Sequence, residues 1–125
     1  MENRVNKVRT HRDLDVWKKS IDLVTLIYKH TADNPKEEMY GLTSQIRRCA
    51  VSIPSNIAEG SARTTKKDFS HFLAIALGSA AELETQLIIS RNLGFLQDAV
   101  LDDLVLELTS IRRMTLGLRK SINKE

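Results

Sequence analysis

A helical hairpin is predicted from residues 47–68, RRCAVSIPSNIAEGSARTTKKD. Its first half belongs to a helix that begins near Gly41, because apolar residues recur every three or four positions there. That apolar face comprises Leu42, Ile46, Cys49, Ala50, Ile53 and Ile57. Gly60 is predicted to end this helix, and Thr65 and Asp68 have the spacing of a capping box that starts the next one.

Pro54 lies inside the first of these helices and lacks the backbone N–H that a helix interior requires. Its ring also crowds the carbonyl of Ala50, so a kink or a local widening is predicted. Short polar side chains beside the proline can bond the freed backbone groups, which favours a bend over a helix end. These side chains are Ser52, Ser55 and Asn56.

A further helix is predicted before the hairpin, and the second arm of the hairpin is itself a long helix. The first is predicted from Asp13, a candidate N-cap, to a stop at Asn34 and Pro35. Its apolar face comprises Leu14, Trp17, Ile21, Val24 and Tyr28. The second arm of the hairpin is predicted over about residues 66–90, with a wide apolar stripe. That stripe comprises Phe69, Phe72, Leu73, Ala76, Leu77, Ala80, Leu83 and Leu87.

A turn is predicted at residues 91–98, RNLGFLQD, where Gly94 suits a left-handed C-cap position and Asp98 is a candidate N-cap. The last helix has the spacing of coiled-coil packing and continues to about residue 122. Its apolar positions are Leu101, Leu104, Leu108, Ile111, Thr115, Leu118 and Ile122. No strand pattern competes, so we expect an all-α, single-domain, up-down antiparallel four-helix bundle over residues 13–122.

The composition limits the class of protein. A length of 125 residues suits one domain, and 42% hydrophobic with 28% charged residues is not a disordered composition. The single cysteine, Cys49, excludes an intramolecular disulfide. Because the N-terminus is polar and no apolar run approaches about 20 residues, we expect a cytoplasmic protein that does not enter a membrane.

The N-terminal residues 1–12 are predicted to form a flexible basic arm, either solvated or in contact with nucleic acid. Elsewhere two predicted helices carry more apolar surface than one stripe needs, at residues 23–27 and 87–89. A helix that is apolar on more than one face is buried on more than one face. We therefore expect a homo-oligomer.

Catalytic chemistry finds little support in the sequence. Asp68 and His71 stand one helical turn apart and match half of a carboxylate-bridged di-iron site, but a second such pair is missing. We therefore expect no enzyme activity, no metal and no cofactor. Three carboxylates near apolar faces could be acids or bases, but interhelical partners for Arg47, Arg48 or the backbone near Pro54 are the preferred reading. They are Glu59, Glu82 and Glu84, and Asn56 is expected to share an internal polar cluster with Glu59.

The cations suggest a polyanionic partner more strongly than the net charge of +3 does. One candidate group for phosphate contacts comprises Arg47, Arg48, Arg63, Lys66 and Lys67. A second, on the last helix, comprises Arg112, Arg113, Arg119 and Lys120. Acidic residues precede the second group in the same helix, so an ordinary response to the helix dipole is an alternative explanation for that helix. Few aromatic residues are available for base stacking, so shape and backbone would be recognised more than sequence.

Four segments together resemble a known family. They are DLDVWKKSIDLV (13–24), EEMYGLTSQIRRCAVSIPSNIAEGSART (37–64), KDFSHFLAIALGSAAELETQL (67–87) and LGFL (93–96). The chain is similar to the four-helix-bundle proteins encoded in intervening sequences of bacterial 23S rRNA genes, also labelled ribosomal protein S23. That family includes the accessory variability protein of diversity-generating retroelements. The matching motif positions are Arg47, Arg48, Ser52, Pro54, Asn56, Glu59, Gly60 and Arg63.

The resemblance implies a ring-like homopentamer with basic surfaces that bind RNA or DNA, and for the retroelement branch a reverse transcriptase as partner. It supplies no catalytic residues. The leading hypothesis is a non-enzymatic oligomeric bundle that binds structured nucleic acid through the two basic groups. The alternative is a protein-interaction scaffold, for example accessory to a reverse transcriptase, without significant nucleic-acid affinity of its own.

Overall fold

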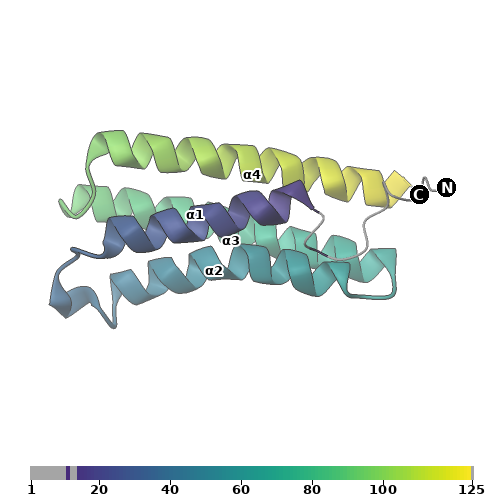
Figure 1. The fold of residues 1–125 in the computed structure, drawn as a ribbon, viewed down its shortest axis with the longest axis horizontal. Helices are drawn as coiled ribbons and strands as arrows, with labels where there is room; N and C mark the ends of the chain where they lie inside the picture. The colour runs from purple at the N-terminus through teal and green to yellow at the C-terminus, as the bar shows by residue number, and fades with distance from the viewer. Residues whose placement is uncertain (1–10, 12–13, 125) are drawn as a thin grey trace.

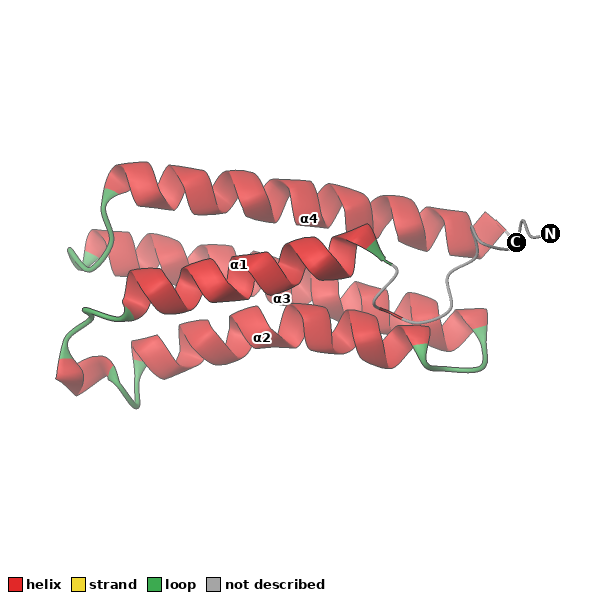
Figure 2. Cartoon of the chain, in the orientation of Figure 1, coloured by secondary structure: helices red, strands yellow, loops and turns green. Residues whose placement is uncertain are grey.

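The computed structural model describes residue 11 and residues 14–124, and within them it contains four long helices and no strand. The helices are α1 (Asp15–Thr31), α2 (Leu42–Ser61), α3 (Lys66–Asn92) and α4 (Asp98–Lys124). A short 3-10 helix, η3 (Lys36–Glu38), connects α1 to α2. Successive helices run antiparallel and pack side by side, and α4 returns to α1 (Figure 1; Figure 2). The predicted all-α four-helix bundle is confirmed.

The core lies along the bundle axis and is built from apolar side chains of all four helices. Fully buried members include Leu23 and Ile27 of α1, with the rest supplied by the stripes predicted for the other helices. Those include Ile46, Ile53, Ile57, Leu73, Leu83, Leu87, Leu104, Leu108 and Ile111. The periodicity therefore identified the buried faces of α2, α3 and α4 correctly.

The buried face of α1 differs from the predicted one. Ile21 and Tyr28, predicted to face the core, are exposed, and Trp17 and Val24 are only partly buried. The core face instead comprises Val16, Ser20, Leu23, Ile27 and Thr31. The prediction failed because this face includes two hydroxyl residues, which are tolerated because each donates a hydrogen bond to a carbonyl one turn earlier.

Helix α2 continues through Pro54, which is buried. Two of the three predicted polar neighbours bond backbone carbonyls close to the proline: Ser52 Oγ donates to Cys49 O at 2.6 Å, and Asn56 Nδ2 donates to Ser52 O at 2.7 Å. The expectation that Pro54 would not end the helix is confirmed.

Gly60 does not end α2, contrary to the prediction. It lies within the helix and is buried against α3. A Cβ atom built on Gly60 would lie 2.8 Å from Phe72 Cβ and 2.9 Å from Phe69 Cδ1. The glycine is therefore needed for the close approach of the two helices, and the end of α2 falls beyond it, at Ser61.

The turns around α3 follow the predicted chemistry with one shift. Thr65 Oγ1 accepts a hydrogen bond from the Asp68 backbone N–H at 3.1 Å, which caps the start of α3. Gly94 has φ +83°, and the N–H of Phe95 bonds the carbonyl of Ser90 at 3.0 Å, as in a Schellman C-cap. Asp98, predicted as an N-cap, is instead the first residue of α4.

Helix α3 also corrects the statement that no segment is apolar enough to cross a bilayer. Its 27 residues include an 18-residue window with mean hydropathy 1.5, which meets the requirements of length and composition, and 39% of that window is buried in the bundle. In the structure α3 packs against both α2 and α4 as a helix of the bundle. The N-terminal arm and the Asp13 cap predicted above lie outside the described residues, apart from His11, whose ring packs edge-on against Trp17.

Candidate nucleic-acid interface

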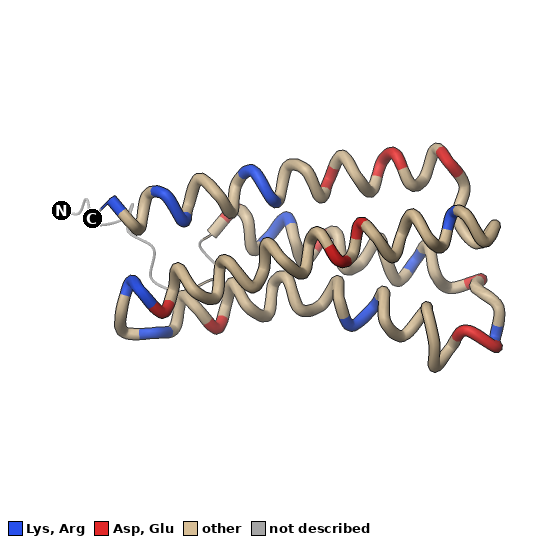
Figure 3. Tube along the Cα trace, turned by 180° about the vertical axis from the view of Figure 1, so that it is seen from behind, with Lys and Arg blue, Asp and Glu red and all other residues tan. Residues whose placement is uncertain are grey.

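Charge is segregated along the bundle. Figure 3 shows Lys and Arg in the turn between α2 and α3 and along the C-terminal half of α4, which lie at the same end of the molecule. We call this the basic end; its cations are Arg63, Lys66, Lys67, Arg119, Lys120 and Lys124, whereas Arg112 and Arg113 lie near the middle of α4. Asp and Glu are concentrated toward the opposite end, in the first turns of α4 and in the connection between α1 and α2, although Glu59 and Asp68 lie beside the cations of the α2–α3 turn. The antiparallel topology thus joins two cationic segments that lie about 50 residues apart in sequence.

A groove of about 470 Å³ at this end brings members of both predicted cationic groups together. Lys66 and Lys67, the first two residues of α3, line it with Arg119 of α4. We call it the basic groove; its other lining residues are Ser70, His71, Ala74, Ile122 and Asn123. Cationic side chains from two helices therefore line one concave surface, an arrangement compatible with phosphate binding.

Arg119 is anchored at the edge of this groove. Its Nε donates to both the backbone carbonyl and the Oγ of Ser70, at 3.2 and 3.0 Å. This contact ties the C-terminal part of α4 to the first turns of α3. Among the described residues no hydrogen bond involves the two terminal amino groups of Arg119, so a fixed guanidinium retains donors for a ligand.

Arg63 lies beside the groove and is held by its own helix. Its Nη2 atom contacts Glu59 Oε2 at 2.6 Å, and its guanidinium carbon lies 4.8 Å from the ring centroid of Phe72. Glu59 and Arg63 are both exposed, so the ion pair contributes less than about 1 kcal/mol to folding. Its main effect is to hold Arg63 over the start of α3. Glu59 is consequently a surface residue, and the internal cluster predicted for it with Asn56 is wrong.

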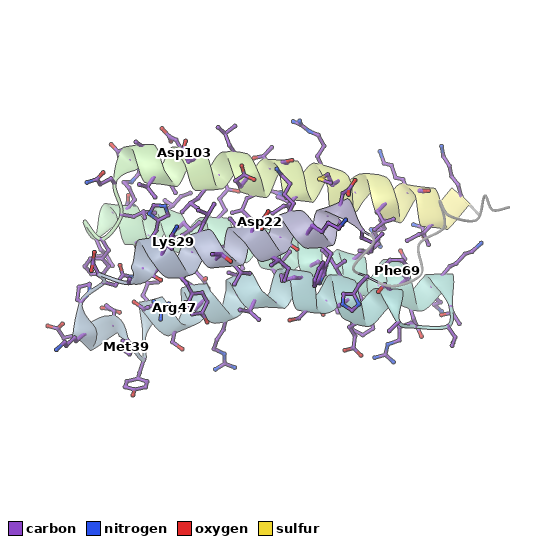
Figure 4. All side chains as sticks on the ribbon, in the orientation of Figure 1. Asp22, Lys29, Met39, Arg47, Phe69 and Asp103 are labelled. Atoms are coloured by element: carbon purple, nitrogen blue, oxygen red, sulfur yellow. The ribbon has the colours of Figure 1, made fainter. Side chains whose placement is uncertain are left out.

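Arg47 and Arg48 lie elsewhere. Figure 4 shows Arg47 on α2, far from Phe69 in the first turn of α3. Arg47 Nε donates to Thr31 Oγ1 at 2.9 Å, and its guanidinium lies 4.5 Å from the centre of the Tyr28 ring, so this side chain joins α2 to α1. Arg48 is exposed on the side of α2 that faces α3 and lines a different groove. The basic end therefore does not include either residue.

The remaining cations of the second group are spread around α4. Arg112 Nη1 contacts Glu84 Oε1 of α3 at 3.2 Å, whereas Arg113 and Lys120 are exposed. Glu84 is thus an interhelical partner, as predicted for the carboxylates, but of Arg112 and not of Arg47 or Arg48.

Three polar residues of the basic groove were missed as binding candidates by sequence reasoning. Ser70, His71 and Asn123 become part of it only because α3 and α4 meet in antiparallel register. In the sequence, His71 and Asp68 have the spacing of half a metal site. In the described part of the chain no group of three metal-binding side chains occurs. The helical period could have indicated that His71 shares a face with Lys67, but not which helix would face it.

Four antiparallel helices with a cationic groove at one end define the class: a helical-bundle protein with a candidate phosphate-binding surface. The chain belongs to the 23S rRNA-intervening sequence protein family, whose sequence model matches residues 12–117. Among solved structures, the chain is similar to a protein of unknown function from the S23 ribosomal protein family of Bacteroides thetaiotaomicron, with a TM-score of 0.76. That alignment has 23% sequence identity and covers 84% of this chain and 95% of the other, so it supports the fold.

The comparison with curated proteins gives no match. The matched family and the structural neighbour's family are not known enzyme families. The resemblance noted from the sequence is therefore confirmed at the level of family and fold.

Proposed function

We propose that this protein is a non-enzymatic, oligomeric bundle that binds structured RNA or DNA through backbone phosphates at its basic end. The observation that supports this most directly is the basic groove, where Lys66, Lys67 and Arg119 converge from two helices. Each phosphate neutralised by such a cation releases condensed counterions, which supplies affinity without base recognition. Arg63 and Lys120 lie on the same end and would extend the contact to neighbouring phosphates, and Arg113 lies farther along α4.

The start of α3 adds to this surface. The first backbone N–H groups of α3 point toward the basic end of the bundle, and the positive end of the helix dipole favours an anion there. The Thr65 hydroxyl already satisfies the N–H of Asp68, so the contribution comes from the N–H groups before it.

Oligomerisation is supported by apolar surface that a single bundle leaves exposed. A groove of about 290 Å³ between α1 and α2 is lined by the apolar residues Trp17, Ile21, Val24, Val51, Pro54 and Ala58 and by His11 and Ser55. The misassigned face of α1 thus forms half of an unpartnered apolar strip. In a ring of parallel protomers the basic ends would lie together and add their charge. The pentameric count, and a reverse transcriptase as partner, remain proposals that rest on the family resemblance.

The second candidate function is a protein-interaction scaffold, and the same apolar strip supports it. Under that proposal the strip binds a different protein, and the basic end is solvated. Binding would then survive moderate salt, since apolar contacts do not release counterions.

Binding of a fluorescent RNA hairpin and a duplex DNA across a salt series tests the first proposal. The double variant Lys67→Gln with Arg119→Gln should lower affinity about tenfold and, for duplex DNA, reduce the slope of log affinity against log salt by about 1.8. The matched control, Lys29→Gln with Lys36→Gln, removes two exposed cations away from the basic end. Equal effects of the two double variants would refute the site, because they would show that only net charge matters.

The oligomer mass should be measured in the same buffers. If the intact wild-type oligomer fails to bind either nucleic acid at low salt, the scaffold becomes the better account.

A further inference from the structure

One contact at the basic groove limits how Arg119 can bind a ligand. Its Nε atom donates to two oxygen atoms of Ser70 on α3, the backbone carbonyl at 3.2 Å and Oγ at 3.0 Å. Because Nε carries a single hydrogen, the two acceptors share it in a three-centre hydrogen bond. Ser70 is only 7% exposed, so its oxygen atoms are largely shielded from water. The Nε donor is therefore occupied before any ligand arrives.

The other donors of the Arg119 guanidinium remain open to a ligand. A guanidinium has five N–H donors, and the four that Nε does not carry belong to Nη1 and Nη2. In the described part of the chain neither of these two atoms makes a hydrogen bond or an ion pair. The side chain is partly exposed and lines the groove. Nη1 and Nη2 together form the end of a planar fork that matches two oxygen atoms of one phosphate.

Arg119 also differs from the arginines that carboxylates hold in place. Arg63 contacts Glu59, and Arg112 contacts Glu84, so a negative charge lies against each of these guanidinium groups. The acceptors of Arg119 are a hydroxyl and a carbonyl oxygen, which are neutral. Among the described residues Arg119 thus combines a fixed position with a charge that no ion pair compensates.

We infer that Arg119 binds a backbone phosphate end-on, through Nη1 and Nη2, and that Ser70 is the positioning residue for this contact. The inference rests on the proposed function and specifies the geometry of one of its contacts. A mobile side chain loses rotamer freedom when a ligand orders it, at a cost that corresponds to about two- to tenfold in affinity. Because Ser70 already orders Arg119, much of that cost is avoided.

The substitution Arg119→Lys separates geometry from charge. Lysine keeps the positive charge but cannot make the planar two-point contact. The variant should bind duplex DNA about fivefold more weakly than wild type, with the same slope of log affinity against log salt. Arg119→Gln should in addition reduce that slope by about 0.9. Arg113→Lys is the matched control at an exposed position of α4, and its affinity should stay within about twofold of wild type.

Ser70→Ala tests the positioning role. It removes Oγ and changes no charge, so affinity should fall about fivefold with an unchanged salt slope. In the Arg119→Gln background the same serine change should have no further effect, because the side chain that Ser70 positions is gone. Ser90→Ala is the control: it removes another buried hydroxyl from α3, toward the opposite end of the helix, and should leave affinity unaltered.

Nitrogen-15 NMR of the arginine side chains tests the geometry directly. When duplex DNA is added, the Nη signals of Arg119 should shift, whereas its Nε–H signal should change little because Ser70 already accepts that hydrogen. A larger shift at Nε–H than at Nη would show side-on binding and overturn the inference.

The outcomes distinguish this inference from the proposed function. If wild type binds neither RNA nor DNA at low salt, both are overturned. If wild type binds and Arg119→Lys binds equally well, the end-on contact is overturned while phosphate binding at the basic end stands. An equal loss of affinity from Ser70→Ala in both backgrounds would show a general structural effect, and the positioning role of Ser70 would be wrong.

Discussion

Replacing Gly60 with alanine tests whether the α2–α3 contact depends on a missing side chain. Alanine stabilises a helix interior by about 1 kcal/mol relative to glycine. At this position, however, the new Cβ would lie 2.8 Å from Phe72 Cβ and 3.3 Å from the Phe69 carbonyl oxygen, and neither atom belongs to a flexible chain end. Relieving such overlap costs about 2–3 kcal/mol. The net expectation is a loss of about 1–2 kcal/mol in the free energy of unfolding.

The control is the same substitution where there is room. Gly78 is exposed in the middle of α3, and a Cβ there meets nothing within 4 Å. Gly78→Ala should therefore raise the free energy of unfolding by about 0.5–1 kcal/mol. Urea denaturation at one fixed protein concentration measures both variants, because stability depends on concentration in an oligomer. If Gly60→Ala is as stable as wild type or more stable, the close-packing explanation is refuted.

Two further predictions concern α2. Arg47→Ala removes the bond to Thr31 and the contact with Tyr28, so unfolding free energy should fall by about 1–2 kcal/mol. Its duplex affinity, measured by anisotropy, should stay within about twofold of wild type; a stable variant that loses binding would contradict the structural role assigned to Arg47. Burial, and then the charge and hydrogen bond of Glu82, raise the pKa of Cys49 from 9.0 to about 12. At pH 8 iodoacetamide should therefore alkylate the native protein at least about a hundredfold more slowly than the urea-unfolded chain, and similar rates would contradict this environment.

The helices of this protein are predictable because local chemistry and packing agree in most of the chain. The structure buries Leu101, Leu104 and Leu108, as their spacing predicts. It also contains the predicted cap, in which the backbone N–H of Asp68 donates to Thr65. Helix α1 is the exception, since its core face includes Ser20 and Thr31 while apolar Ile21 faces outward. Hydropathy alone cannot separate a face that packs inside the chain from one suited to a surface contact.

The candidate site was harder to predict than the fold. Sequence patterns identified clusters of cations, but grouping them required the register of the helices. Proximity in sequence placed Arg47 with Lys67, whereas the bundle places Arg119 beside Lys67 and directs Arg47 toward α1. The role of Gly60 was missed for a similar reason: a glycine near a helix end resembles a C-cap until the neighbouring helix is known.

The separation of charge along the bundle makes the molecule a rod with a permanent electric dipole. A 27-residue helix is about 40 Å long, and the Debye length at physiological salt is about 8 Å. Salt therefore screens the charges of the acidic end almost completely from a polyanion bound at the basic end. Near 0.01 M salt the Debye length grows to about 30 Å, and the distant carboxylates begin to exert a torque that turns the rod end-on before contact. Orientation during approach should therefore depend on ionic strength even where the final complex does not change.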